Sequence, residues 1–153
     1  MKNNIKVLVL ALIFLPFNSY GRVISVSDYG ALGDGKTVNT RTIQKAIDDC
    51  HESGGGTVLF SNGNYVTGTL LLKSNVFLHI EVGATLSGST EFSDYASNVF
   101  RNQYADKNKK EGCLIFAENA ENIGIEGKGR VDGRGYRSNF PNPEDPKKDR
   151  PML

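Results

Sequence analysis

The pattern with the most direct chemical meaning is a glycine-rich stretch that precedes the clearest helix signal of the chain. Residues Gly30 to Thr37 have the sequence GALGDGKT, which matches the phosphate-binding loop G-x-x-x-x-G-K-[ST]. That chemistry needs a helix that begins at the lysine and points its N-terminal amides at the phosphates. The helix-capping signal lies later, at Asn39 or Thr40, and no apolar strand ending in a magnesium-binding aspartate follows. We therefore interpret the stretch as a structural turn and not as a nucleotide site.

Two other clusters resemble chemical sites in composition only. Gly54 to Gly56 follow a helix signal and precede a strand signal, which reverses the order found in a dinucleotide-binding fingerprint. We interpret them as the end of the helix. Asp48 and Asp49 are adjacent carboxylates, but consecutive helical residues point about 100° apart and do not face a common substrate. A solvated helix face is the interpretation that we adopt for this pair.

The two histidines have no serine or cysteine partner that would indicate nucleophilic catalysis. His79 lies in a strand-like segment where apolar and other side chains alternate. His51 lies at the end of the helix, where a cation interacts favourably with the helix dipole. Both are interpreted as structural.

A polar stretch from Glu91 to Glu111 combines aromatic and basic residues and is predicted to be an excursion loop. Aromatic rings stack on sugars and cations pair with carboxylates, so these side chains are candidates for a rim that binds an anionic sugar polymer. The candidate residues are Tyr95, Phe100, Arg101, Tyr104, Lys107, Lys109 and Lys110. A merely solvated loop is the alternative, and the sequence leaves both open.

One helix and a series of short strands must position these groups. The helix is amphipathic, with apolar residues at offsets of three, four and seven: Ile43, Ala46, Ile47 and Cys50. Short apolar or alternating runs predict the strands: Val23–Val26, Thr57–Phe60, Tyr65–Leu72, Val76–Val82, Cys113–Ala117 and Ile123–Glu126. Glycines mark tight turns around Arg130 to Asp132, and the proline-rich stretch from Ser138 to Pro151 predicts a surface loop.

Two architectures fit short strands separated by glycine and asparagine, namely an antiparallel sandwich and a solenoid of parallel coils. A sandwich needs two-residue hairpin turns, and Asn62-Gly63 is the only such signal between strands. A solenoid needs a cover for the exposed end of its first coil, and the amphipathic helix supplies one. The order of the elements therefore favours the solenoid.

The N-terminus has the three parts of a secretory signal in the right order. Lys2 and Lys6 precede an apolar run from Val7 to Phe17, and small residues at Ser19 and Gly21 follow. The run is too short to cross roughly 30 Å of hydrocarbon, which takes about 20 residues. We expect residues 1–21 to be a signal peptide and residues 22–153 to form one domain, exported to the periplasm or secreted. The formal net charge of +1 gives no field that would attract nucleic acid or an anionic membrane.

The two cysteines of the chain do not indicate a particular fold or site. Cys50 and Cys113 are too few for a disulfide scaffold, although an exported chain could hold one bridge. A bridge and two separate buried thiols both remain open. Neither cysteine lies in a zinc-ligand spacing, so we assign no metal or cofactor site.

Several segments together resemble glycoside hydrolase family 28, the polygalacturonases, within the pectate-lyase-like superfamily. VSDYGALGDGKTVNTRTIQKAIDDC, from Val26 to Cys50, is similar to the family's first strand, glycine-aspartate loop and capping helix. The segment from Gly54 to Ser89 is similar to its first coils. GKGRVDGRG, from Gly127 to Gly135, resembles a later turn, and Arg150-Pro151 resembles a dipeptide before the next strand. The resemblance covers nearly all of the chain after the signal.

This resemblance implies an all-β, right-handed, single-stranded parallel β-helix with an N-terminal capping α-helix. It also implies hydrolysis of α-galacturonide bonds in anionic, pectin-type polysaccharide, no cofactor, and a monomer at full length. A polysaccharide lyase on the same fold, which uses calcium and a basic residue, and a non-catalytic carbohydrate-binding β-helix are the alternatives.

The family's catalytic motifs do not occur on matching segments of this chain. They are an Asn-Thr-Asp pattern, an Asp-Asp pair, a Gly-His-Gly and an Arg-Ile-Lys, and Asp48-Asp49 lies on the cap helix instead. Inverting glycosidases need two carboxyl groups roughly 6.5 to 9.5 Å apart, and no such pair is assigned here. We therefore name no catalytic residue. We expect the chain to be the inactive N-terminal portion of a longer enzyme, an incomplete solenoid whose acid and base lie beyond residue 153.

Overall fold

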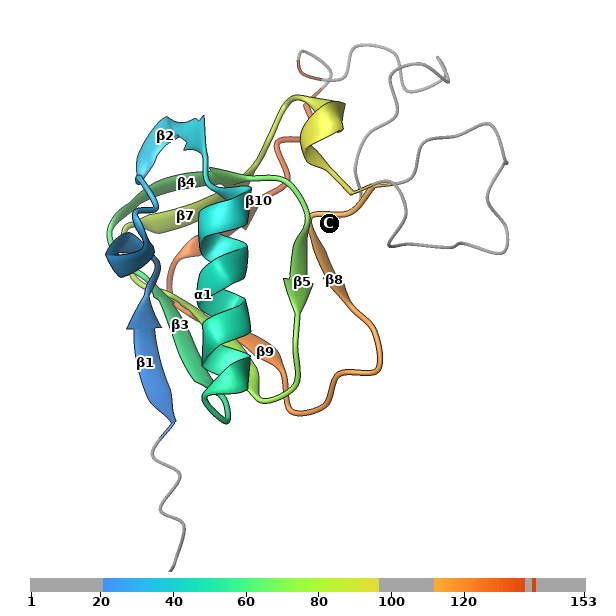
Figure 1. Ribbon diagram of the computed structural model, residues 1–153. Coiled ribbons are helices and arrows are strands. Elements are labelled where there is room, and N and C mark those ends of the chain that lie inside the picture. The colour runs from blue at the N-terminus through green and yellow to red at the C-terminus, as the bar shows by residue number, and fades with distance from the viewer. Residues whose placement is uncertain (1–20, 97–111, 137–138, 140–153) are drawn as a thin grey trace, which may run out of the picture.

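The computed structural model describes residues 21–96, 112–136 and 139. It confirms the predicted fold class, a right-handed parallel β-helix with one α-helix at its N-terminal end (Figure 1). The predicted signal peptide and most of both predicted loops lie outside the described residues. No helix in the described part is both long enough and apolar enough to span a bilayer.

Each coil of the chain contributes strands to up to three parallel sheets. The first sheet contains, in order, β1 (Arg22–Ser25), β3 (Gly56–Phe60), β6 (Val76–Ile80) and β9 (Gly124–Gly127). The second contains β2 (Asp34–Val38), β4 (Gly63–Thr67), β7 (Ala84–Gly88) and β10 (Arg130–Asp132). The third contains β5 (Leu70–Leu72) and β8 (Ile115–Ala117). Every pairing is parallel, as a coiled chain requires.

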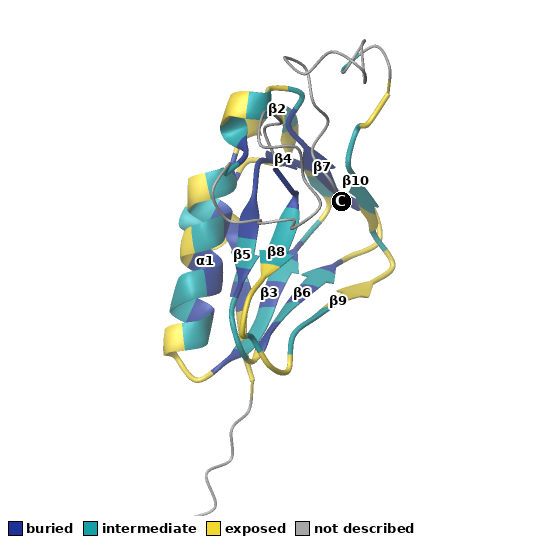
Figure 2. Ribbon diagram, turned by 90° about the vertical axis from the view of Figure 1, so that its right-hand side faces the viewer, coloured by how far each residue is buried: buried dark blue, intermediate teal, exposed yellow. Residues whose placement is uncertain are grey.

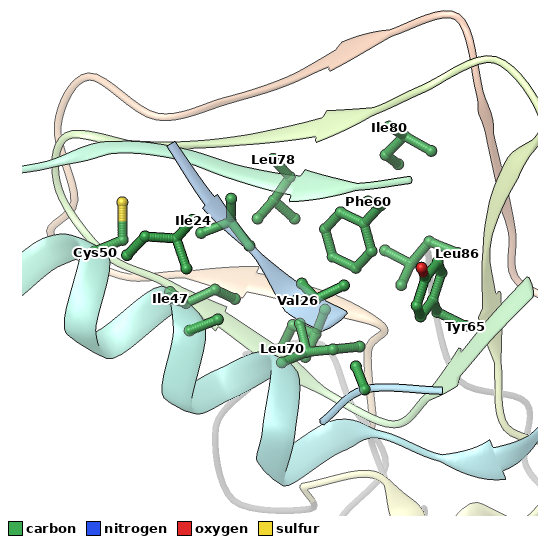
Figure 3. Packing of buried hydrophobic residues seen from close by; sticks show 14 of the residues in the cluster. Ile24, Val26, Ile47, Cys50, Phe60, Tyr65, Leu70, Leu78, Ile80 and Leu86 are labelled. Atoms are coloured by element: carbon green, nitrogen blue, oxygen red, sulfur yellow. The ribbon is translucent and has the colours of Figure 1, made fainter. Parts of the chain in front are cut away.

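The core is a set of side chains stacked from coil to coil. Ile24 pairs with Val58, which pairs with Leu78, and all three are almost completely buried. Phe60 and Tyr65 turn inward from neighbouring strands of one coil and meet edge to face with ring centroids 5.6 Å apart (Figure 3). Since strands alternate their side chains between faces, the same register that pairs the backbones also aligns the apolar residues.

The helix α1 (Thr40–Glu52) covers the side of the stack next to β5 (Figure 1). Its four predicted apolar residues are buried, and its exposed residues face away from the strands (Figure 2). The side chain of Gln44 accepts the N–H of Leu71 at 2.8 Å and donates to the carbonyl of Leu71 at 3.0 Å. One amide side chain thus satisfies both polar groups of the middle residue of β5, on a strand whose other edge pairs with β8. The predicted cap is confirmed.

The corner between the third and first sheets repeats a left-handed residue in each coil. These residues are Gly55 (φ 101°), Asn75 (φ 65°) and Asn122 (φ 53°). The Asn122 side-chain amide donates to the Asn75 side-chain oxygen at 3.1 Å. A Cβ at Gly55 would lie 2.5 Å from the Asn75 carbonyl oxygen, so glycine is required there. Asparagine tolerates this conformation better than other residues, which explains its place at the corner.

Four local predictions need correction. The predicted turn at Gly30–Thr37 is partly strand β2, and the turn region at Arg130–Asp132 is strand β10. Strand β7 was not predicted. The run Tyr65–Leu72 divides into β4 and β5 at a corner. These strands are three to five residues long, and their conformation is set by pairing with the neighbouring coil, which a local pattern does not record.

The double hydrogen bond of Gln44 gives the first testable prediction. Gln44→Ala should lower the free energy of unfolding by about 1–2 kcal/mol, because two backbone groups of β5 lose their partner. Arg41→Ala is the matched control, since Arg41 is an exposed residue of the same helix and should change stability by less than about 0.5 kcal/mol. Urea denaturation of the natural full-length protein would measure both values. Equal losses for the two variants would contradict the capping role.

Candidate functional site

One corner of the β-helix differs from the others in the length of chain that it carries. Between the second and third sheets, the first complete coil turns at Gly68–Thr69 alone. In the next coil, residues 89–114 lie between β7 and β8 at the same corner. The other connections are short, such as Ser61–Asn62 and Lys73–Asn75. Because function concentrates in loops placed on a rigid scaffold, we take this corner as the candidate site.

The buried polar side chains of the described part gather at the same corner. They lie near the ends of β4 and β7 and at the start of α1: Asn39, Thr67, Thr69, Ser87 and Ser89. Burying a polar group is costly unless it is hydrogen-bonded, and none of the buried side-chain oxygen or nitrogen atoms in the described residues lacks a partner. The corner is therefore a satisfied and rigid polar structure.

Hydrogen bonds tie both ends of the long connection to this corner. The Ser89 hydroxyl donates to the Asp94 carboxylate, and the Tyr95 hydroxyl donates to the Ser89 carbonyl at 2.8 Å. Thr69 accepts the N–H of Ala96 at 3.0 Å and donates to the carbonyl of Cys113 at 2.6 Å. The short helix η2 (Phe92–Asp94) begins the connection. Residues on both sides of the connection are thus held against one threonine.

Tyr95 corrects one of the rim predictions. Tyr95 is 5% exposed, so its ring does not offer a face to a sugar. Burial, together with the nearby Asp94 carboxylate, raises the pKa of Tyr95 to about 12. The hydroxyl therefore stays protonated and acts as a hydrogen-bond donor. The other rim candidates, Phe100 to Lys110, lie outside the described residues.

Two residues join the first coil to this corner. Asn39 precedes α1 as predicted, but its side chain does not cap the helix. Its oxygen accepts the N–H of Leu32 at 2.8 Å, and its nitrogen donates to the Thr37 carbonyl at 2.7 Å. The Thr40 hydroxyl accepts the N–H of Gly68 at 2.7 Å. The helix start and the corner are thus one hydrogen-bonded unit.

The phosphate-loop match is explained by Asp34. Its carboxylate accepts the N–H groups of Lys36 at 2.9 Å and Thr37 at 2.8 Å, and the Thr37 hydroxyl at 2.7 Å. These are the amides that a phosphate would need, so the chain's own carboxylate occupies the position of the ligand. The same hydrogen bonds lower the pKa of Asp34 to about 2. The segment does not build a nucleotide site.

The remaining sequence candidates have structural partners. Asp48 forms an ion pair with Lys73 at 2.9 Å, and Asp49 accepts the Tyr29 hydroxyl at 2.9 Å. The two carboxylates thus have separate partners, and His51 lies 2.9 Å from the Ser74 carbonyl oxygen.

His79 lies on the first sheet, with its Nδ1 atom 3.1 Å from a Glu126 carboxylate oxygen of the next coil. His79, together with Gly127 and Lys128, borders an open groove of about 640 Å³. The groove belongs to a different sheet from the candidate corner.

The cysteines do not pair. Cys50 in α1 and Cys113 at the corner are both free and buried, and burial raises the pKa of each thiol. Of the two alternatives that the sequence left open, separate buried thiols is the one that the structure shows. The described residues contain no cluster of three ligand side chains for a metal.

A family model and individual proteins of known sequence match most of this chain. The sequence model of the family described as rhamnogalacturonase A/epimerase, pectate lyase-like, matches residues 23–140. The exo-poly-alpha-D-galacturonosidase of Dickeya chrysanthemi is 38% identical over 123 residues, which is 76% of this chain and 20% of that protein. Alginate lyase 7 of Azotobacter vinelandii is 34% identical over 124 residues, covering 71% of this chain and 14% of that protein.

A solved structure agrees with these sequence relatives. The family 28 exopolygalacturonase of Yersinia enterocolitica superposes with a TM-score of 0.64 at 36% identity, over 73% of this chain and 21% of that chain. The present chain thus spans about a fifth of the length of the galacturonosidase relative.

The low pKa of Asp34 gives the second prediction. Because the folded pKa lies below the ordinary value, the carboxylate stabilises the loop above about pH 4, and this contribution is lost as the pH falls toward about 2. The stability difference between wild type and Asp34→Asn should therefore shrink over that interval. Unfolding measured against pH tests this, with the exposed Asp28→Asn as control. A difference that is constant from pH 6 to about pH 2 would contradict it.

Proposed function

Because the chain belongs to the rhamnogalacturonase A/epimerase, pectate lyase-like family, we propose that its full-length protein hydrolyses α-linked galacturonide bonds in pectic polysaccharide. The observation that carries the proposal is the 38% identity to an exo-poly-alpha-D-galacturonosidase, supported by the superposition on a family 28 exopolygalacturonase. The chain covers a fifth of that relative, so we assign the activity to the full-length protein and not to residues 1–153 alone.

The corner between the second and third sheets supplies the part of the substrate-binding surface that lies in this chain. Buried polar side chains gather at this corner on a scaffold whose backbone is fixed by parallel pairing. The strands β7 and β10 run to the corner side by side, and Asp132 and Arg134 lie where β10 ends. A long polymer needs such an extended, rigid edge, because every sugar must be held in register with its neighbours.

We place the acid and base of the reaction outside residues 1–153. The adjacent carboxylates Asp48 and Asp49 lie on the cap helix, away from the corner. Asp48 forms an ion pair with Lys73, and Asp49 accepts the Tyr29 hydroxyl. The role of this chain is then to cap the β-helix and to contribute one end of the binding surface. Inversion by two carboxyl groups roughly 6.5 to 9.5 Å apart remains the mechanism we expect for the whole protein.

A lyase is the second candidate function, favoured by the 34% identity to an alginate lyase. Galacturonan and alginate are both polymers of uronic acids, so both functions require recognition of a sugar that carries a carboxylate. Hydrolysis adds water across the glycosidic bond, whereas β-elimination leaves a conjugated double bond in the new non-reducing end. The two reactions therefore give products that are easily distinguished.

The third prediction tests the activity directly. The natural full-length protein, incubated with polygalacturonate, should release reducing ends without ultraviolet absorbance from a double bond. Alginate under the same conditions should give few reducing ends, because its sugars and linkages differ. Ultraviolet-absorbing products from either polymer would support the lyase and contradict the hydrolase. Binding without any product would favour a non-catalytic carbohydrate-binding β-helix.

Export is the fourth prediction, and it rests on the charge, apolar and small-residue order of residues 1–21. The protein isolated from outside the cytoplasm should begin at Arg22, as measured by mass spectrometry of its N-terminal peptide. Replacement of Leu10 and Leu12 by Arg should retain the protein inside, because the apolar run is interrupted. Retention of an uncut Met1 on exported protein would contradict the cleavage site.

A further inference from the structure

One residue at the corner has an unusual backbone conformation. In the described part of the chain, the non-glycine residues with positive φ are three asparagines, Asn75, Asn119 and Asn122, and Arg134 with φ 51°. Asparagine adopts the left-handed region readily because its short polar side chain can hydrogen-bond locally, whereas arginine pays the steric cost of its Cβ without that compensation. Arg134 lies between Gly133 and Gly135, where the chain already uses the residue type best suited to such a position. A strained residue that glycine could replace suggests that its side chain is needed.

The conformation of Arg134 is fixed from both sides. Its N–H donates to the Asp132 carboxylate at 2.8 Å, and its carbonyl accepts the Asn139 side-chain amide at 2.8 Å. Asp132 belongs to β10, which pairs with β7 in the second sheet. The direction in which the arginine leaves the backbone is therefore set by the scaffold. Such preorganisation lowers the cost of ordering a side chain on binding.

The guanidinium group has capacity for a ligand. It is half-buried, and within the described residues its hydrogen bonding is limited to one long contact of 3.5 Å between its Nη1 atom and the Gly88 carbonyl. No described carboxylate lies within ion-pair distance of it. A guanidinium has five donors, two of which can bind a carboxylate side by side. A Cβ on Gly88 would lie 2.6 Å from the Tyr95 hydroxyl and 3.1 Å from the Gly133 carbonyl oxygen, so Gly88 and the chain leading to Arg134 lie beside Tyr95 at the candidate corner.

Tyr136 lies two residues further along the same segment. It is 64% exposed, which is unusual for a large aromatic side chain. An exposed phenol ring offers an apolar face together with a polar tip, the combination that packs against a sugar ring and still reaches its hydroxyl groups. A cation and an aromatic face thus occur within one short segment at the end of β10.

We propose that Arg134 and Tyr136 form a uronate subsite, in which the guanidinium pairs with the carboxylate of one sugar and the tyrosine ring packs against a sugar of the same polymer. This inference rests on the proposed function, because it assigns to two residues the recognition of an acidic sugar. It goes further by making the free carboxylate a requirement. Methyl esterification removes the charge, so esterified polymer binds more weakly at this subsite.

Arg134→Gly is the informative variant, because it removes the side chain and also relieves the backbone strain. In the natural full-length protein it should keep or raise the thermal midpoint, while the affinity for unesterified oligogalacturonate falls by at least about tenfold. A merely structural arginine would instead show unchanged binding. The matched control is Arg130→Gln, which also removes one positive charge, from the exposed start of β10, but leaves Arg134 in place. It should change affinity much less.

Calorimetric titration with unesterified and fully methyl-esterified oligogalacturonate, at low salt, gives the readout. Wild type should prefer the free acid, Arg134→Gly should lose that preference, and Tyr136→Ala should weaken both ligands equally. Unchanged preference in Arg134→Gly, or an equal loss in Arg130→Gln, overturns the subsite. If wild type binds none of these ligands, the proposed function fails and the subsite fails with it, whereas binding by wild type and by Arg134→Gly alike removes the subsite alone.

Discussion

The structure depends on the parallel hydrogen bonding between successive coils. Val58 pairs with Ile24 of the coil before and with Leu78 of the coil after, so each strand fixes the position of the next. Within the sheets an extra residue would shift a whole strand by one position and turn its apolar side chains to the solvent. Additional chain is therefore accommodated at corners, or at the edge of the stack, where the register of β2 against β4 breaks between Asp34 and Val38. The position of the long connection between β7 and β8 at a corner is consistent with this constraint, and a candidate site arises there.

The same constraint creates a problem at the start of the stack. A first coil has no earlier coil to satisfy its edge, and an open edge is prone to pair with other chains. The helix α1 covers the side next to β5, and its Gln44 side chain supplies one donor and one acceptor to Leu71 in the manner of a neighbouring strand. Asn39 and Thr40 then connect the helix start to the Thr37 carbonyl and to the amide of Gly68. Asn39 and Thr40 thus belong both to the start of the cap helix and to the candidate corner.

The helix and the most buried strands could be predicted from the sequence because their signals are local. Helical spacing located α1, and apolar runs located β3 and β6. The strands β2, β7 and β10 could not be predicted in this way, because their conformation is imposed by partners from other coils. Tyr95 was placed on a binding rim for a similar reason. Its burial depends on the space left by Gly88, where a Cβ would lie 2.6 Å from the Tyr95 hydroxyl, and a local sequence pattern does not record this approach.

The residues with left-handed backbone conformation differ in whether their side chains stabilise the fold or are left available for a ligand. Where the stack requires such a conformation at every turn, as at Asn75 and Asn122, the sequence uses the residue type that tolerates it, and the two side chains bond to each other. At Asp34 the backbone amides of the loop donate to the chain's own carboxylate, so they are not available to bind an anionic ligand. Arg134 follows neither rule, since it accepts backbone strain and keeps most of its donors unused by the described residues. Because packing and hydrogen bonding among the described residues do not account for an arginine there, its side chain fits the acidic-ligand role that we propose.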